Sequence, residues 1–164
     1  MSMIDDALAA NPALAKGYDP ARSAPPHPQV AIVTCADPRL TGILQLLGFE
    51  DADVDLIRNV GTVVDDDVIR SLVVSTQVLG SREILIINHT GCGMTTFADD
   101  DLEARLRTQT GKAPIAPAKF YAFTDVDANT KEQVFKTRSH PWISAEVPVR
   151  GFVLDLETGL LREV

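Results

Sequence analysis

Short runs of apolar and β-branched residues recur along the chain and are separated by more polar segments. Three of them, at residues 30–34, 54–57 and 83–87, have the length and composition of buried strands. The first and third are apolar almost throughout, as is typical of parallel strands covered on both faces. Residues 149–156 and 160–164, joined by Glu-Thr-Gly, predict a further strand and a hairpin.

Helical patterns lie between these runs. The predicted helices cover residues 3–10, 40–47, 68–79, 99–107 and 130–138. Gly48 and Gly80 follow two of them and are expected to end them, while aspartates at 65–67 suit a helix start. Alternating strands and helices predict an α/β fold, with a mainly parallel central sheet flanked by helices.

The N-terminal segment differs in composition from the rest of the chain. After its short helical start, residues 1–28 contain five prolines and a glycine, which interrupt regular structure. We predict an N-terminal arm over residues 1–28 that is either mobile or laid on another subunit. Residues 29–164 form a single α/β domain, long enough to bury a core without disulfides or a structural metal.

The net charge of the chain limits the classes of molecule that it is expected to bind. The chain has 23 acidic against 15 basic residues and a net charge of −8, which argues against nucleic-acid binding. It has no apolar run of the ~20 residues that a membrane span requires. The first ten residues include two aspartates and lack the pattern of a secretory signal, so we expect a cytoplasmic protein that acts on a small molecule.

The chain's two cysteines and one of its histidines follow predicted strands. Cys35 ends the first strand, and His89 and Cys92 come just after the third. Ligand sites in parallel sheets lie at the carboxyl ends of strands, so these side chains are expected to converge. Two thiolates and an imidazole form a zinc site with a free fourth position, as in catalytic centres. His27 and His140 are not at strand ends and are expected not to bind metal.

Each of these residues also has a structural interpretation. A cysteine at the end of an apolar strand is often simply part of the core, and a single His-x-x-Cys occurs frequently by chance. Asp37 and Arg39, close to Cys35, form a charged pair that is costly to bury without a function. Asp37 is equally well placed to cap the helix that starts near Leu40, and both roles are compatible.

Three short blocks together resemble a known family. They are Cys-x-Asp-x-Arg at residues 35–39, Arg-Asn-x-Gly at 58–61 and His-x-x-Cys-Gly at 89–93. Their order and spacing resemble the signature of the β-carbonic anhydrases, with the similarity covering residues 29–97. The resemblance implies a small member of that family, which hydrates carbon dioxide reversibly to bicarbonate with one Zn²⁺ ion.

The resemblance also implies roles for individual residues. Zinc is expected on Cys35, His89 and Cys92, with Asp37 orienting the activated water and Arg39 holding that carboxylate away from the metal. If the ion pair breaks, Asp37 can itself become the fourth ligand and close the site. By the same resemblance, the backbone N–H of Gly93 faces the substrate.

The same resemblance implies an oligomeric state, and it shows two positions at which this sequence departs from the family. A homodimer is the expected minimum and a homotetramer is the alternative, with the arm laid over a neighbour. Pro38 and Gly91 depart from residues found in many or some members. Pro38 is expected to stiffen the link between Asp37 and Arg39, and Gly91 removes a polar group near the metal.

Three other functions remain open at this point. The same scaffold can hydrolyse carbon disulfide or carbonyl sulfide, and the three blocks do not distinguish these substrates. A cysteine-nucleophile hydrolase using His89 and Cys92 lacks an evident third group to orient the base. A non-catalytic zinc protein would keep its site permanently closed by Asp37.

Overall fold

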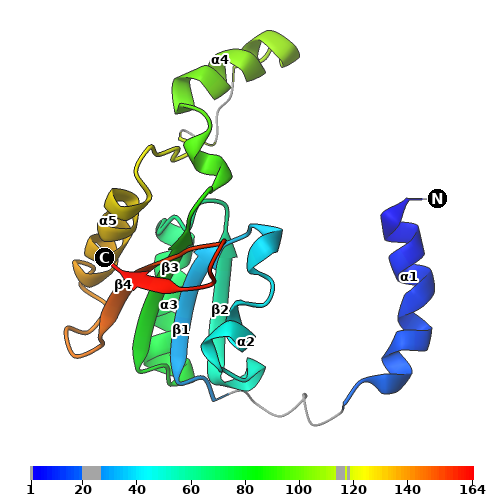
Figure 1. The fold of residues 1–164 in the computed structure, drawn as a ribbon, viewed down its shortest axis with the longest axis vertical. Coiled ribbons are helices and arrows are strands. Elements are labelled where there is room, and N and C mark those ends of the chain that lie inside the picture. Colours follow the sequence, from blue (N-terminus) through cyan, green and yellow to red (C-terminus); the bar gives the residue numbers. More distant parts are fainter. Residues whose placement is uncertain (1, 20–26, 114–116, 118) are drawn as a thin grey trace.

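A five-stranded sheet forms the centre of the molecule (Figure 1). The computed structural model describes residues 2–19, 27–113, 117 and 119–164. The strands are β1 (Val30–Cys35), β2 (Val54–Asn59), β3 (Glu83–His89), β4 (Val149–Leu154) and β5 (Leu161–Glu163). Their order is β2-β1-β3-β4-β5, with β5 alone antiparallel to its neighbour. The predicted, mainly parallel sheet is confirmed.

Strand β1 lies inside the sheet, between β2 and β3, and all six of its residues are buried. Its side chains alternate between two separate cores, so an apolar residue is favourable at every position. On one face Ile32 packs with Ile43 and Leu44, and on the other face Val33 packs with Val68 and Leu72.

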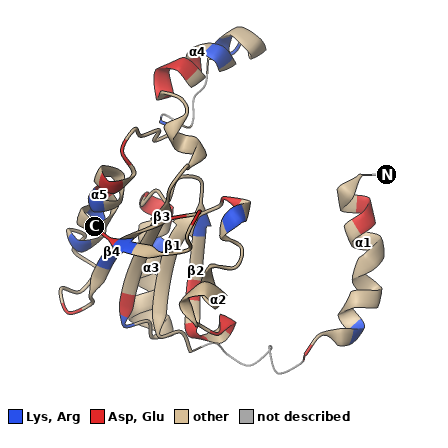
Figure 2. Ribbon diagram, in the orientation of Figure 1, with Lys and Arg blue, Asp and Glu red and all other residues tan. Residues whose placement is uncertain are grey.

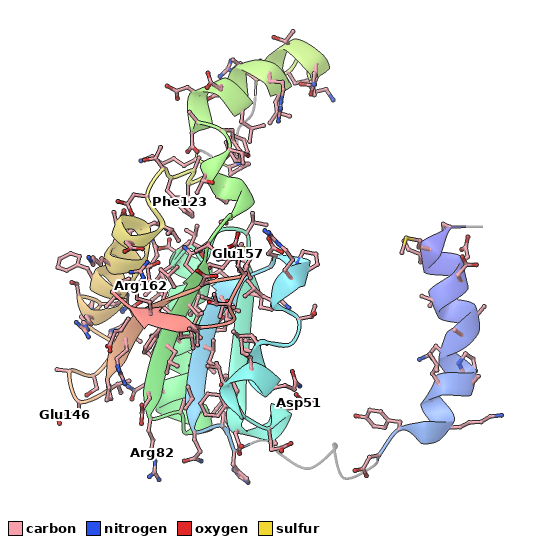
Figure 3. All side chains as sticks on the ribbon, in the orientation of Figure 1. Asp51, Arg82, Phe123, Glu146, Glu157 and Arg162 are labelled. Atoms are coloured by element: carbon pink, nitrogen blue, oxygen red, sulfur yellow. The ribbon has the colours of Figure 1, made fainter. Side chains whose placement is uncertain are left out.

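Helices cover both faces of the sheet. The α-helices within the described residues are α1 (Met3–Leu14), α2 (Ile43–Leu47), α3 (Asp66–Val74), α4 (Asp99–Thr110) and α5 (Val126–Arg138). Shorter turns are η1 (Ala15–Gly17), η3 (Pro38–Leu40), η4 (Asp51–Asp53), η5 (Ser75–Leu79, a π-helical turn) and η6 (Gly93–Thr95). Core residues place α2 on one face, and α3 and α5 on the other. An ion pair between Arg162 of β5 (Figure 3) and Asp127 of α5 fastens the last strand to this layer.

Several helix boundaries differ from those expected. The first helix continues through Pro12 to Leu14, because a proline near the end of a helix removes only one backbone hydrogen bond. The predicted helix at 40–47 is two pieces, η3 and α2, with Gly42 between them. The last predicted helix begins earlier, at Val126, where the Asp125 side chain accepts two backbone N–H groups.

The glycine stops were predicted correctly. Gly48 and Gly80 both adopt left-handed backbone conformations as the C-terminal caps of α2 and η5, which is the conformation that favours glycine.

Helices α1 and α4 extend away from the sheet (Figure 1), and Figure 2 shows the acidic first turn of α4. Every described residue of α1 is exposed, including the large apolar side chains of Met3, Ile4 and Leu8. No helix within the described ranges is both long and apolar enough to cross a membrane.

Candidate metal centre

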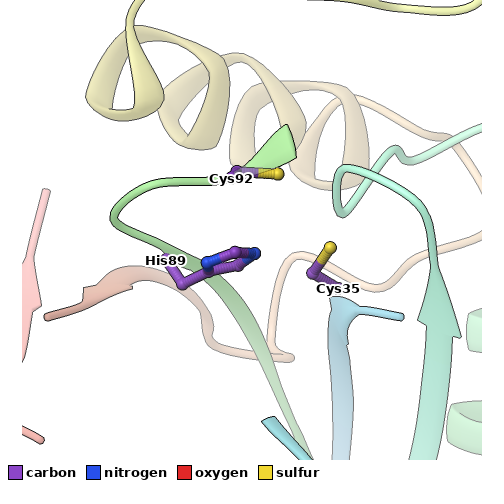
Figure 4. Close-up of side chains that lie close together, drawn as sticks. All are labelled: Cys35, His89 and Cys92. Atoms are coloured by element: carbon purple, nitrogen blue, oxygen red, sulfur yellow. The ribbon is translucent and has the colours of Figure 1, made fainter. Parts of the chain in front are cut away.

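Cys35, His89 and Cys92 converge at the carboxyl edge of the sheet (Figure 4). Cys35 is the last residue of β1 and His89 the last of β3, and these strands are adjacent and parallel. Cys92 follows in the turn before η6. Their potential ligand atoms lie within 4.8 Å of one another, and all three side chains are buried. Across the described ranges, this is the single cluster of three or more such residues compact enough to hold a metal.

The imidazole of His89 has one nitrogen engaged and one free for a ligand. Nδ1 lies 2.9 Å from the carbonyl oxygen of Thr90, so Nδ1 carries the proton and donates it. Nε2 is buried and has no hydrogen-bond partner among the described residues. A buried nitrogen lone pair without a partner is unfavourable, and a metal ion provides one.

Thr90 is itself held by residues from the end of β4. Its backbone N–H donates to the carbonyl of Leu154 at 2.9 Å, and its hydroxyl accepts the N–H of Leu156 at 3.0 Å. The carbonyl that fixes the tautomer of His89 is therefore anchored on both sides.

The two thiols shift each other's pKa in opposite directions. A hydrogen bond from Cys92 lowers the pKa of Cys35 to about 4 despite burial, and the backbone N–H of Gly61 also donates to this sulfur. The hydrogen bond to Cys35 and burial both raise the pKa of Cys92. A divalent cation bound here would favour the thiolate form of both residues. Two soft thiolates and an imidazole fit Zn²⁺ better than Mg²⁺ or Ca²⁺.

Asp37 and Arg39 form a two-point ion pair beside the cluster. Nε and one terminal nitrogen of Arg39 lie 2.9 and 2.5 Å from the two carboxylate oxygens of Asp37. Arg39 lowers the pKa of Asp37 through this side-chain hydrogen bonding and through its backbone N–H. Oδ2 of Asp37 is also 3.8 Å from Nε2 of His89. The backbone N–H of Arg39 donates to Asp37, which caps η3, so the predicted capping contact and ion pair coexist.

Arg58 supports the same segment from β2, a role that sequence reasoning missed. Its guanidinium donates to the carbonyls of Cys35 and Asp37 at 3.0 and 2.8 Å, which fixes the backbone on both sides of Ala36. The Arg-Asn-x-Gly block indicated that this residue matters, but the block does not reveal its partners.

The remaining residues singled out in the sequence lie around or away from the cluster. Gly93 begins η6, next to Cys92, and a Cβ added there would meet no atom within 4 Å. Gly91 adopts a left-handed conformation, and its carbonyl accepts a hydrogen bond from Arg39 at 2.9 Å. His140 packs edge-on against Trp142 and is not part of the cluster.

Comparison with known proteins agrees with this geometry. A family model described as carbonic anhydrase matches residues 30–161. β-Carbonic anhydrase 1 of Mycobacterium tuberculosis is 39% identical, over 100% of this chain and 99% of that protein. A carbon disulfide hydrolase of an Acidianus species is 31% identical, over 85% of this chain and 78% of that protein. The crystal structure of carbonic anhydrase from Streptococcus mutans superposes with a TM-score of 0.85 at 35% identity, covering 100% and 98% of the two chains.

Proposed function

The chain belongs to the β-carbonic anhydrase family, and we propose on this basis that it catalyses the zinc-dependent, reversible hydration of carbon dioxide to bicarbonate. One observation carries the proposal at the level of the site. A buried Cys₂His cluster with an unpartnered imidazole nitrogen lies beside a carboxylate held by arginine. This arrangement provides a metal site and a polar group next to it.

Cys35, His89 and Cys92 are the proposed zinc ligands. When bound, the ion supplies Lewis acidity that makes water a competent nucleophile near neutral pH. The two thiolates offset the charge of a divalent ion. A zinc ion bound by them is therefore a weaker Lewis acid than one bound by three histidines. We therefore expect activity to increase toward alkaline pH.

Asp37 is the proposed orienting group. Its Oδ2 faces the cluster and, with the carboxyl pKa lowered, remains an acceptor throughout the physiological range. It can accept a hydrogen bond from the attacking water and thereby align a lone pair toward carbon dioxide. Arg39 restrains the carboxylate, and without that restraint Asp37 becomes a potential fourth ligand.

Gly93 is the proposed substrate contact. It follows Cys92 directly, and the space beside its Cα is open. A small linear molecule can approach its backbone N–H there without displacing a side chain.

A second substrate class is carbon disulfide, because that activity is named for relatives of this chain. Identity is higher, and extends over more of both proteins, for the mycobacterial carbonic anhydrase. This difference in identity and coverage favours carbon dioxide over carbon disulfide as the substrate.

We further propose a homodimer or homotetramer in which the arm lies on a neighbouring subunit. The support is the exposure of α1, whose Met3, Ile4 and Leu8 side chains are 89, 70 and 68% exposed. Burying such side chains against another chain is favourable by ~1.5–3 kcal/mol each when complete.

Three measurements on the purified protein test the activity. Zinc is quantified by elemental analysis, and hydration of carbon dioxide is followed by stopped-flow proton release. The zinc-loaded protein is then offered carbon disulfide under the same conditions. Hydration of carbon dioxide supports the proposal, whereas hydrolysis of carbon disulfide alone reassigns the substrate.

A further inference from the structure

We propose that Gln133 of α5 is a positioning residue for the thiolate of Cys35, acting through the loop formed by residues 60–64. The inference rests on the proposed function in one respect, the assignment of Cys35 as a metal ligand. Gln133 lies outside the three sequence blocks and has no direct contact with the cluster among its hydrogen bonds.

The loop at 60–64 brings a backbone donor to the ligand sulfur. The N–H of Gly61 donates to Sγ of Cys35 over 3.4 Å. Such a bond withdraws electron density from a thiolate, so the position of the loop influences how strongly the sulfur donates to a metal.

The backbone of this loop has two consecutive residues with positive φ, which is unfavourable for the second of them. Gly61 has φ of 88°, and Thr62, a β-branched residue, has φ of 57°. Thr62 is fully buried, and a Cβ on Gly61 would lie only 2.9 Å from Cγ of Met94. Non-glycine residues persist in this region when surrounding contacts hold them there.

Helix α5 supplies such contacts at both ends of the loop. Oε1 of Gln133 accepts the N–H of Val64 at 2.9 Å, and its Nε2 donates to Oδ1 of Asn129 at 3.0 Å. Nδ2 of Asn129 in turn donates to the carbonyl of Gly61 at 3.5 Å. The two amides are 2 and 8% exposed, and their donors and acceptors match in one orientation of the amide groups.

Asn59 also holds the same loop, at Val63, next to Val64. Its side chain donates to the carbonyl of Val63 at 2.6 Å and accepts that residue's N–H at 2.8 Å. Asn59 belongs to β2, whereas Gln133 and Asn129 connect the loop to a different layer. Removing the contacts from α5 should therefore loosen Gly61 and Val64, while Asn59 still holds Val63.

The test compares two buried substitutions on α5. Gln133→Met keeps the length of the side chain and removes both of its hydrogen bonds. Thr137→Val, the matched control, removes one hydrogen bond to the Gln133 carbonyl one turn later, within the helix itself. Both full-length variants are loaded with Co²⁺, which reports thiolate ligation through a charge-transfer band, and separately with Zn²⁺.

Gln133→Met is expected to move the thiolate-to-cobalt band to lower energy, because a thiolate with a weaker N–H···S bond donates more readily. Because the sulfur is then also held less precisely for metal binding, the variant should release zinc to a competing chelator about 10-fold faster, at the lower end of the 10–100-fold loss of metal affinity that follows removal of groups supporting metal ligands. Thr137→Val should leave the band and the release rate unchanged, whatever its effect on stability. Asn129→Leu, which breaks the longer bond to Gly61, should shift the band in the same direction by less.

The outcomes separate the two proposals. A parent protein without a thiolate-to-cobalt band contradicts the metal centre itself. A parent with the band, and a folded Gln133→Met variant whose band and zinc release match the parent's, overturns the role of Gln133 alone. If Gln133→Met does not fold, Asn129→Leu decides the question by the same two measurements.

Discussion

Asp37 and His89 meet at the candidate metal centre, with Oδ2 of the carboxylate 3.8 Å from Nε2 of the imidazole. The same carboxylate oxygen lies 2.5 Å from the guanidinium of Arg39. Asp37 is thus held by a cation from its own turn while it faces the nitrogen assigned to the metal. Substitution of Arg39 and substitution of Asp37 should therefore have different effects.

Removing Arg39 should close the site. Arg39→Ala frees Asp37 to bind the metal, so we expect a zinc-loaded protein with a fourth oxygen ligand from carboxylate and about 100-fold lower activity. X-ray absorption at the zinc edge and a crystal structure of the variant check the ligand set. Arg70→Ala, which breaks the exposed pair with Asp67, is the control and should remain fully active. An Arg39→Ala variant with parental activity would show that this ion pair only caps η3.

Removing Asp37 should leave the site open but slow. Asp37→Ala is expected to retain zinc while kcat falls by about 10²–10⁴, the usual contribution of one oriented proton-transfer or hydrogen-bonding group. Zinc content and stopped-flow kinetics across pH measure the two effects separately. Loss of zinc from this variant would instead identify Asp37 as a permanent ligand.

Substitution of the proposed ligands should remove the metal and leave the fold. The parent is expected to contain about one zinc per chain, and Cys35→Ser, His89→Ala and Cys92→Ser to contain little and to lack activity. Circular dichroism should show near-parental secondary structure, because a domain of this length has its own core. His140→Ala is the control and should keep both zinc and activity. Global unfolding of the three ligand variants would favour a structural metal.

Deletion of residues 1–28 should weaken subunit association more than zinc binding. The α1 side chains are exposed in the single chain, so their proposed burial on a neighbour is lost without disturbing the cluster. Analytical ultracentrifugation at micromolar concentration, together with zinc analysis, measures both properties. A truncated chain that keeps the full oligomeric state excludes an important role for the arm in assembly.

Acid should weaken a connection at the start of α4. Backbone N–H groups of Ala122, Phe120 and Tyr121 donate to Asp99 and lower its carboxyl pKa below the ordinary value of 3.8. A lowered pKa in the folded state stabilises the fold above pH 3.8, and that stability is lost as pH falls through the folded-state value.

Asp99→Asn should therefore be less stable than the parent at neutral pH, and the difference should narrow below pH 3.8. Urea unfolding at pH 7 and pH 3 measures this difference in the free energy of unfolding. Asp100→Asn, an exposed neighbour in the same turn, controls for the change of charge. A stability difference that is constant with pH would contradict the assigned cause.

The strands and the convergence of Cys35, His89 and Cys92 were predictable because they depend on local patterns and one geometric rule. A continuous apolar run identifies β1 as an inner strand, and parallel strands end at one edge, which brings Cys35 and His89 together. The contact between Val64 and Gln133 was not predictable, because it joins residues 69 positions apart through tertiary packing. The carbonyl groups to which Arg58 donates were not predictable either. The sequence pattern names the arginine but does not indicate which acceptors lie within its reach.

The tautomer of His89 depends on Thr90, and Thr90 is anchored by Leu154 and Leu156, near the end of the chain. During synthesis the cysteines and the histidine emerge long before these anchors do. A nascent chain that has not yet paired β4 with β3 contains every proposed ligand but lacks the contact that directs Nε2 toward the cluster. We therefore expect tight metal loading to follow the docking of β4 against β3.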